Sequence, residues 1–136
     1  MRILLIEDDL DDIELLQEAL KSGGVSYEME IIHDGSDALN YLRDNGEGPD
    51  IIILDLNLPK VHGREVILEI KSIPAFKHIP LLILSTSSSK EDMDYAYKNG
   101  ATKYLVKPSN VQQINETVNA IVSMYNENAV PGKPRK

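Results

Sequence analysis

The chain has 136 residues, a length typical of one compact domain with a sizeable core. It contains no cysteine, which excludes disulfides, thiolate catalysis and cysteine-based metal sites. Its formal net charge of -8 argues against binding to nucleic acid or to anionic membranes. Since it shows neither an apolar run long enough to span a bilayer nor a secretion signal, we expect a soluble, cytoplasmic protein.

The first half of the sequence alternates between short apolar runs and apolar residues at helical spacing. A continuous apolar run predicts a buried strand, and glycines after a helical stripe predict its end. In chain order we expect a strand over residues 3–6 ending in acids, a helix from 10 to the glycines at 23 and 24, an edge strand near 29–33, a helix over 34–42 and a loop over 45–49.

The centre of the chain is the stretch 51–59, IIILDLNLP. Its four leading apolar residues, three of them β-branched, predict a strand buried on both faces, as in a parallel sheet. The run ends on a single charge, Asp55, and Asn57 and Pro59 then turn the chain away. We therefore expect Asp55 at the rim of the sheet, where open α/β sheets bind their ligands.

The second half continues the alternation of helices and strands. The expected elements are a helix over 63–73 stopped by Pro74, a strand over 81–84 ending at Ser85, a helix capped by Ser89 with Asp92 and ended by Asn99 and Gly100, a strand over 104–106 ending at Lys107 and Pro108, and a helix to about residue 125 with Ser109 and Gln112 as its cap. We expect a domain over residues 1–126 and a flexible tail over 127–136.

Strands and helices thus alternate five times, which predicts an α/β fold with a doubly wound parallel sheet and helices on both faces. The flavodoxin-like strand order 2-1-3-4-5 places the first and third strands side by side. In that order Glu7, Asp8 and Asp55, which are far apart in the sequence, lie at one edge of the sheet.

Clustered carboxylates repel one another unless a cation compensates them. With oxygen ligands alone, including the carbonyl of Asn57, the expected cation is Mg²⁺. Ser85 adds a hydroxyl and Lys107 an ammonium from two further strand ends. These groups are the ones that phosphoryl transfer needs, with Asp55 as the acceptor.

Each residue also has a simpler interpretation. Acids just before or inside the first turn of a helix favour its dipole, and we assign Asp9, Asp11 and Asp12 to that role. The three histidines lie in separate segments without ligand spacing, so no metal site is expected from them. A functional site is favoured because four strands each end in a different chemical group that phosphoryl transfer needs: the acid pair, the acceptor carboxylate, a hydroxyl and an ammonium.

These strand ends resemble the receiver domain of two-component response regulators, and the resemblance covers the chain to about Tyr125. The residues that carry it are Glu7, Asp8, Asp55, Ser85, Lys107 and Pro108. The resemblance implies a single-domain response regulator that accepts a phosphoryl group on Asp55 from a sensor histidine kinase or phosphotransfer protein. It also implies that Mg²⁺ is held by Glu7, Asp8, Asp55 and the Asn57 carbonyl, with Asp8 and Asp55 as direct ligands.

The resemblance further implies a switch. Ser85 and Lys107 would bind phosphoryl oxygens, the Lys107–Pro108 bond would be cis, and Tyr104 would turn inward when Ser85 moves. The face of the fourth helix, fifth strand and fifth helix would then change its partner contacts or form a homodimer. Residues 55–66, DLNLPKVHGREV, are similar to regulators that pair with bacterial and cyanobacterial phytochromes.

Two other functions fit parts of the pattern. A Mg²⁺-dependent phosphatase of the haloacid dehalogenase kind also has an aspartate after a buried strand, but it needs a second acid where this chain has Asn57. A phosphate-independent interaction module would keep the fold and usually lose the acceptor or the lysine, yet Asp55 and Lys107 are both present. We therefore expect a signalling protein and not an enzyme.

Overall fold

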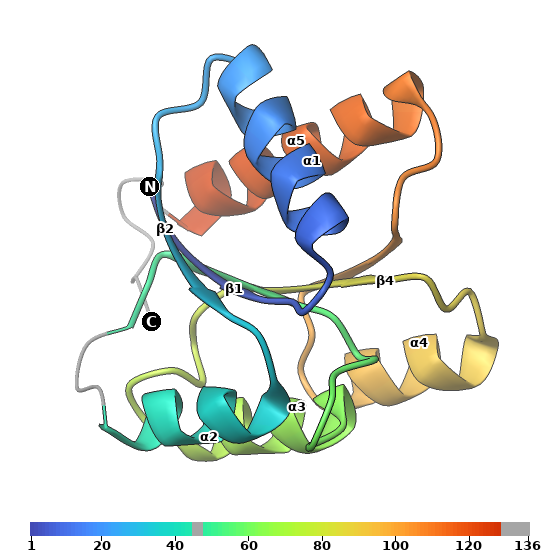
Figure 1. Cartoon of the computed structure of the whole chain (residues 1–136). Helices are drawn as coiled ribbons and strands as arrows, with labels where there is room; N and C mark the ends of the chain where they lie inside the picture. The colour runs from blue at the N-terminus through green and yellow to red at the C-terminus, as the bar shows by residue number, and fades with distance from the viewer. Residues whose placement is uncertain (45–47, 129–136) are drawn as a thin grey trace.

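The structure, a computed structural model, describes residues 1–44 and 48–128. It is a five-stranded parallel sheet between two layers of helices (Figure 1). The strands are β1 (Arg2–Ile6), β2 (Glu28–Ile32), β3 (Ile51–Leu54), β4 (Leu81–Ser85) and β5 (Lys103–Val106). The helices are α1 (Leu10–Ser22), α2 (Gly35–Asp44), α3 (Gly63–Ser72), α4 (Lys90–Lys98) and α5 (Val111–Asn128). The strand order is β2-β1-β3-β4-β5, which confirms the predicted topology.

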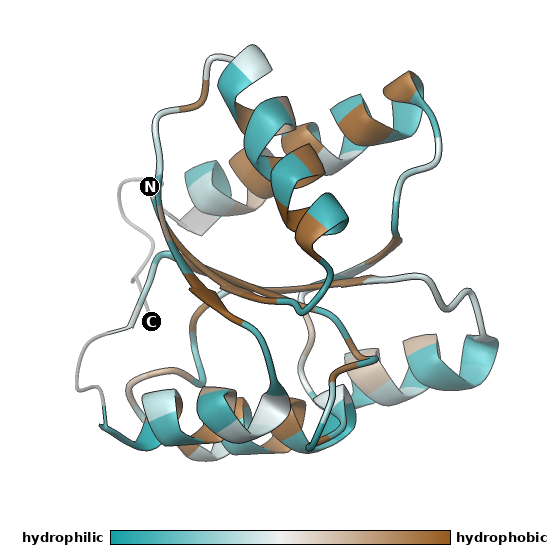
Figure 2. Cartoon of the chain, in the orientation of Figure 1, coloured by the Kyte–Doolittle hydropathy of each residue, from teal (hydrophilic) through white to brown (hydrophobic). Residues whose placement is uncertain are grey.

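The sheet separates two apolar cores. Helices α1 and α5 cover one face, and α2, α3 and α4 cover the other (Figure 1). Successive side chains of a strand point to opposite faces, so Ile51 and Ile53 enter the first core while Ile52 and Leu54 enter the second. All residues of β3 and β4 are buried, whereas β2 and β5 are partly exposed edge strands. The apolar character of the sheet is visible in Figure 2.

Of the two helix caps predicted from a cap residue and its partner, one is confirmed and one is shifted by a residue. The backbone N–H of Asp92 donates to Ser89 Oγ at 3.0 Å, so the predicted cap of α4 is confirmed. The cap of α5 is Asn110, not Ser109, because the helix begins one residue later than expected. Asn110 Oδ1 accepts from the backbone N–H of Gln113 at 2.8 Å, and an Asn side chain is among the most favourable caps.

Helix α5 continues through residue 128, two residues beyond the expected domain boundary. The rest of the expected tail, residues 129–136, and residues 45–47 of the expected loop lie outside the described residues. Across the two described ranges, no helix has both the length and the apolar character that crossing a bilayer requires.

The loop after Asp55 is held very close to the start of α3. The backbone N–H of Gly63 donates to the carbonyl of Leu56 at 2.9 Å. A Cβ on Gly63 would lie 2.4 Å from the Leu56 Cα and 2.8 Å from the Asp55 carbonyl oxygen. Only glycine therefore fits here, and it sets the path of the chain that leaves the strand carrying Asp55.

We expect Gly63→Ala to lower the free energy of unfolding by about 3 kcal/mol, because the new methyl meets backbone that cannot move aside. Urea unfolding measures this loss. Gly24→Ala is the matched comparison, because Gly24 has a φ of 72° and nothing within 4 Å of a built Cβ. Gly24→Ala should lower the free energy of unfolding by about 1 kcal/mol, because alanine is strained only by the left-handed backbone at this position. Equal losses in the two variants would contradict the packing argument.

Candidate functional site

Three carboxylates meet where β1 and β3 end. These strands are neighbours, and the N–H of Asp55 continues their pairing by donating to the Ile6 carbonyl at 3.0 Å. One oxygen from each of Glu7, Asp8 and Asp55 lies within 4.8 Å of the other two. Glu7 and Asp55 are 3% and 4% exposed, whereas Asp8 is open to solvent. The structure thus brings together the acids that the sequence placed at separate strand ends.

Lys107, from the end of β5, lies at the centre of this cluster. Its Nζ is 3.0 Å from Asp55 Oδ2 and 2.8 Å from Glu7 Oε1. A third carboxylate, that of Asp12, is closer still, with Oδ2 at 2.6 Å. From the sequence, Asp12 is expected only to favour the helix dipole, so this contact is not predicted. Its position in the first turn of α1, at the same sheet edge as Lys107, was the available signal.

The neighbouring acids Asp9 and Asp11 behave as the helix interpretation predicts. Asp9 is the cap of α1, and its Oδ1 accepts from the backbone N–H groups of Asp11 and Asp12 at 2.9 and 3.1 Å. Asp11 is exposed. Of the three acids assigned to the helix terminus, Asp12 is therefore the one that contacts Lys107.

The cluster holds more negative than positive charge. Burial and, to a lesser extent, the charge of Asp55 raise the pKa of Glu7 to about 7, although the hydrogen bond from Lys107 opposes the rise. Burial disfavours the charged form of Lys107, but hydrogen bonds to Asp12, Glu7 and Asp55 outweigh it and raise its pKa. A further cation would reduce the repulsion among these carboxylates, and their hard oxygen donors fit Mg²⁺ or Mn²⁺. Asn57 is exposed, and its backbone N–H donates to Asp55 Oδ1 at 3.1 Å.

Ser85 is the last residue of β4, and Tyr104 lies on the neighbouring strand β5. Ser85 is fully buried, and its Oγ accepts from the backbone N–H of Ser87 at 3.2 Å. Tyr104 is only 6% exposed, and its hydroxyl donates to the Ser87 carbonyl at 2.8 Å. The aromatic ring is therefore turned inward, and both residues bond to the loop between β4 and α4.

Residues 3–119 match the response regulator receiver domain family. The chain belongs to this family. Receiver domains act in two-component signalling and are signalling proteins, not enzymes in the ordinary sense. The receiver match covers every strand end of the acidic site, from Glu7 to Lys107.

Relatives of this receiver domain include phytochrome response regulators. It is 40% identical to the response regulator Rcp1 of Synechocystis sp. over 130 residues, which cover 92% of this chain and 88% of Rcp1. A crystal structure of the Mn²⁺-bound form of Rcp1 matches with a TM-score of 0.79 at 39% identity, covering 90% and 91% of the two chains. The phosphorylated cyanobacterial phytochrome response regulator RcpA matches with a TM-score of 0.83 at 41% identity, covering 95% and 96%.

The expected cis bond between Lys107 and Pro108 is wrong for this structure. No peptide bond in the described part of the receiver domain is cis. The trans form is favoured by about 0.5–1 kcal/mol before proline. Here a trans bond already lets the Lys107 ammonium reach Asp55 at 3.0 Å, so the contact does not require the cis form.

A polar network fixes the loop that receives Tyr104. Ser87 Oγ donates to Asp92 Oδ2 at 2.6 Å, and Arg64 Nη2 donates to Asp92 Oδ1 at 2.6 Å. These two hydrogen bonds hold the pKa of Asp92 below its usual range. The Arg64 guanidinium also lies 4.7 Å from the centre of the Tyr95 ring. The network joins α3, α4 and the β4–α4 loop, and no local sequence pattern predicts it.

We expect Tyr104→Phe to lower the free energy of unfolding by about 1 kcal/mol, because the partly buried Ser87 carbonyl loses its donor. Urea unfolding measures the loss. Tyr97→Phe is the comparison, since the half-exposed Tyr97 hydroxyl accepts from the Tyr104 N–H and water can replace it. A larger loss in Tyr97→Phe than in Tyr104→Phe would contradict the importance of the inward hydroxyl.

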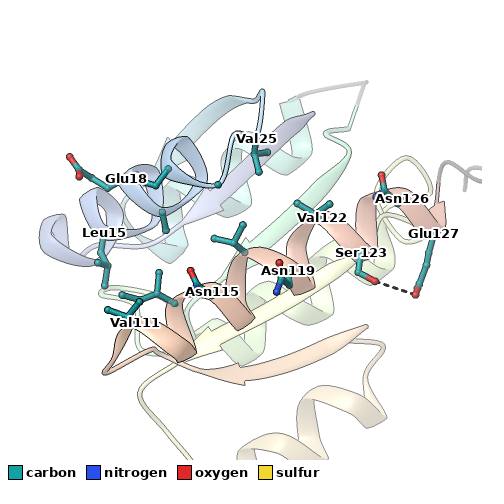
Figure 3. A pocket seen from close by; sticks show the side chains of 15 residues that line it. Leu15, Glu18, Val25, Val111, Asn115, Asn119, Val122, Ser123, Asn126 and Glu127 are labelled. Carbon is teal, nitrogen blue, oxygen red and sulfur yellow. Dashed lines mark hydrogen bonds between the residues drawn. The ribbon is translucent and has the colours of Figure 1, made fainter.

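A groove of about 970 Å³ lies between α1 and α5. Figure 3 shows Leu15 of α1 directed toward Val111 of α5, and Glu18 and Asn115 also line the groove. None of the acids around Lys107 lines the groove, so it is distinct from the acidic site.

Proposed function

We propose that this receiver domain accepts a phosphoryl group on Asp55 from a sensor histidine kinase in the cytoplasm. The observation that carries the proposal is the setting of the Asp55 carboxylate. It lies at a strand end with the Lys107 ammonium 3.0 Å away and the oxygens of Glu7 and Asp8 close by. A carboxylate in such a setting can act as a nucleophile toward phosphorus, because the charge of the transferred group is neutralised nearby.

In the proposed reaction an Asp55 oxygen attacks the phosphorus of the donor. A new P–O bond forms, the bond from phosphorus to the donor breaks, and the leaving group departs with its electron pair. Lys107 neutralises charge on the transferred oxygens, and the buried Ser85 hydroxyl donates to one of them after a small movement.

We further propose Mg²⁺ as the metal, held by Glu7, Asp8, Asp55 and the Asn57 carbonyl. The raised pKa of Glu7 and the oxygen-only donor set support a hard divalent cation. When bound, the cation neutralises phosphoryl oxygens during transfer. That Rcp1 has been crystallised with Mn²⁺ is consistent with this assignment.

The names of the relatives suggest a phytochrome as the histidine kinase partner. We propose that phosphorylation acts through the face formed by α4, β5 and α5, through Ser85 and Tyr104, and changes docking or homodimer formation there. A phosphate on Asp55 adds about 1.5 to 2 negative charges beside these residues. Sedimentation with and without beryllofluoride should show a change in oligomer or partner affinity, and identical behaviour in both states would count against this output.

The test of the acceptor is incubation with acetyl phosphate and Mg²⁺ followed by intact-mass measurement. The wild type should gain one phosphoryl group, Asp55→Asn should gain none, and Asp11→Asn, which changes an exposed acid, should match the wild type. Equal labelling of Asp55→Asn would remove Asp55 as the acceptor. An unlabelled wild type would favour the phosphate-independent module, and turnover of small phosphoesters would favour the phosphatase.

A further inference from the structure

Lys107 is held by one carboxylate that stands outside the group of acids at the strand ends. We propose that Asp12 is a positioning residue for phosphoryl transfer, which keeps the Lys107 ammonium in place beside Asp55. This inference rests on the proposed function, because it concerns the same reaction.

The geometry shows a direct and well-supported contact. Asp12 Oδ2 lies 2.6 Å from Lys107 Nζ, shorter than the distances to Glu7 and Asp55. The backbone of Asp12 is fixed by its N–H bond to the Asp9 cap at 3.1 Å. The Lys107 side chain is 11% exposed and that of Asp12 is 34% exposed, so Asp12 reaches the ammonium from the rim of the site.

The three carboxylates around Lys107 are not equivalent. An ammonium has three N–H donors, and three carboxylates lie within 3.0 Å of this one. Glu7 and Asp55 also belong to the acids that converge as metal ligands, whereas Asp12 does not. A divalent cation would compete with Lys107 for Glu7 and Asp55, but it leaves the Asp12 contact intact.

Phosphorylation would change the Asp55 contact as well. Once an Asp55 oxygen is bonded to phosphorus, the negative charge moves to the phosphoryl oxygens, and the Lys107 N–H that faced Asp55 must turn to one of them. Asp12 is then the carboxylate that holds the lysine without taking part in either event. Asp12 therefore keeps the Lys107 ammonium in place while the contacts of Lys107 with Glu7 and Asp55 change.

The cavity beside the lysine stem is mostly apolar, and the other two carboxylates within reach of the ammonium, those of Glu7 and Asp55, belong to the proposed metal ligands. A cavity of about 30 Å³ beside Lys107 is lined mainly by apolar side chains that include Leu5, Leu84 and Ile114, and the acids that line it are Glu7 and Asp12. A charged group does not settle in such a cavity. Without Asp12, Lys107 can turn toward solvent, and each transfer must wait for its return.

The simpler interpretation is that Asp12 only favours the dipole of α1. Asp11 separates the two interpretations, because it lies in the same first turn, carries the same charge and is exposed. A dipole effect would be alike in Asp11→Asn and Asp12→Asn. A positioning effect belongs to Asp12 alone.

The test measures phosphorylation of wild type, Asp12→Asn, Asp12→Glu and Asp11→Asn by acetyl phosphate at saturating Mg²⁺. We expect Asp12→Asn to lower the maximal rate about 10- to 100-fold with little change in the KM for acetyl phosphate, because misplacing a catalytic group slows chemistry more than binding. Asp12→Glu should restore most of the rate, and Asp11→Asn should match the wild type. Should Asp12→Asn fail to fold in a thermal scan, Asp12→Ser replaces it, with the same expected loss.

A second readout needs no phosphorylation. In NMR of the unphosphorylated protein, the Lys107 ammonium should exchange slowly with water in the wild type and in Asp11→Asn, and rapidly in Asp12→Asn. If Asp12→Asn matches Asp11→Asn in rate and exchange, the positioning role is wrong while the proposed function stands. If the wild type takes up no phosphate, the proposed function fails and the inference fails with it.

Discussion

Replacing Lys107 with methionine is expected to slow phosphorylation of Asp55 by about 100- to 1000-fold, the usual cost of losing one charged donor in a transfer site. The ammonium lies 3.0 Å from Asp55 Oδ2, close enough to reach an oxygen of the group being transferred. Methionine keeps a similar length and apolar stem, so the packing around the side chain at position 107 is largely preserved. Initial rates with acetyl phosphate and Mg²⁺, followed by intact mass, measure the effect.

The same substitution should strengthen metal binding. Lys107 now pairs with Glu7 and Asp55, which the proposed cation also uses, so removing the ammonium removes a competitor. Calorimetric titration with Mg²⁺ should therefore give a lower Kd for Lys107→Met than for wild type. The exposed Lys103 on β5 provides the control, and Lys103→Met should change neither quantity. Slower transfer together with weaker metal binding would contradict this division of roles.

In the metal-free protein, stability should fall as the pH rises from about 4.5 to about 7. Burial and the charge of Asp55 raise the pKa of Glu7 from 4.5 to about 7 in the folded state. Between these values the folded protein holds a proton that the unfolded chain has released, so the contribution is full below pH 4.5 and lost above 7. The shift corresponds to a loss on the order of 3 kcal/mol.

Urea unfolding in EDTA at several pH values measures this slope. Glu7→Gln cannot ionise and should flatten it, while Glu14→Gln, on an exposed residue of α1, should leave it unchanged. Added Mg²⁺ should also flatten the slope, because a cation stabilises the ionised carboxylate. A stability that rises with pH over this window in EDTA would mean that Glu7 is ionised well below pH 7.

The parts of the site that the sequence predicted are those fixed by topology. A buried strand ending in a charge places that charge at the sheet edge, and the strand order makes Glu7 and Asp55 neighbours across a gap of nearly fifty residues. Ser85 and Lys107 follow from the same rule at β4 and β5. The pattern of strand ends was sufficient, because backbone pairing alone decides these positions.

The parts that the sequence missed depend on side-chain directions across different elements. By sequence, Asp12 is an ordinary acid in the first turn of a helix. Its contact with Lys107 depends on how α1 packs beside the end of β5. The Arg64–Asp92 pair joins two helices whose relative position no local pattern encodes. The cap of α5 was misplaced by one residue, because Ser109 and Asn110 are both residue types that favour the cap position and the local sequence does not distinguish them.

The central claim, that Asp55 carries the phosphoryl group, is tested most directly by chemical trapping. Borohydride reduces an aspartyl phosphate to homoserine, and peptide mapping then locates the modified residue. After treatment with acetyl phosphate and Mg²⁺, we predict homoserine at position 55 and at no other aspartate, and none when Mg²⁺ is replaced by EDTA. Homoserine at another position, or none at position 55 in protein whose mass shows a bound phosphoryl group, would contradict the account.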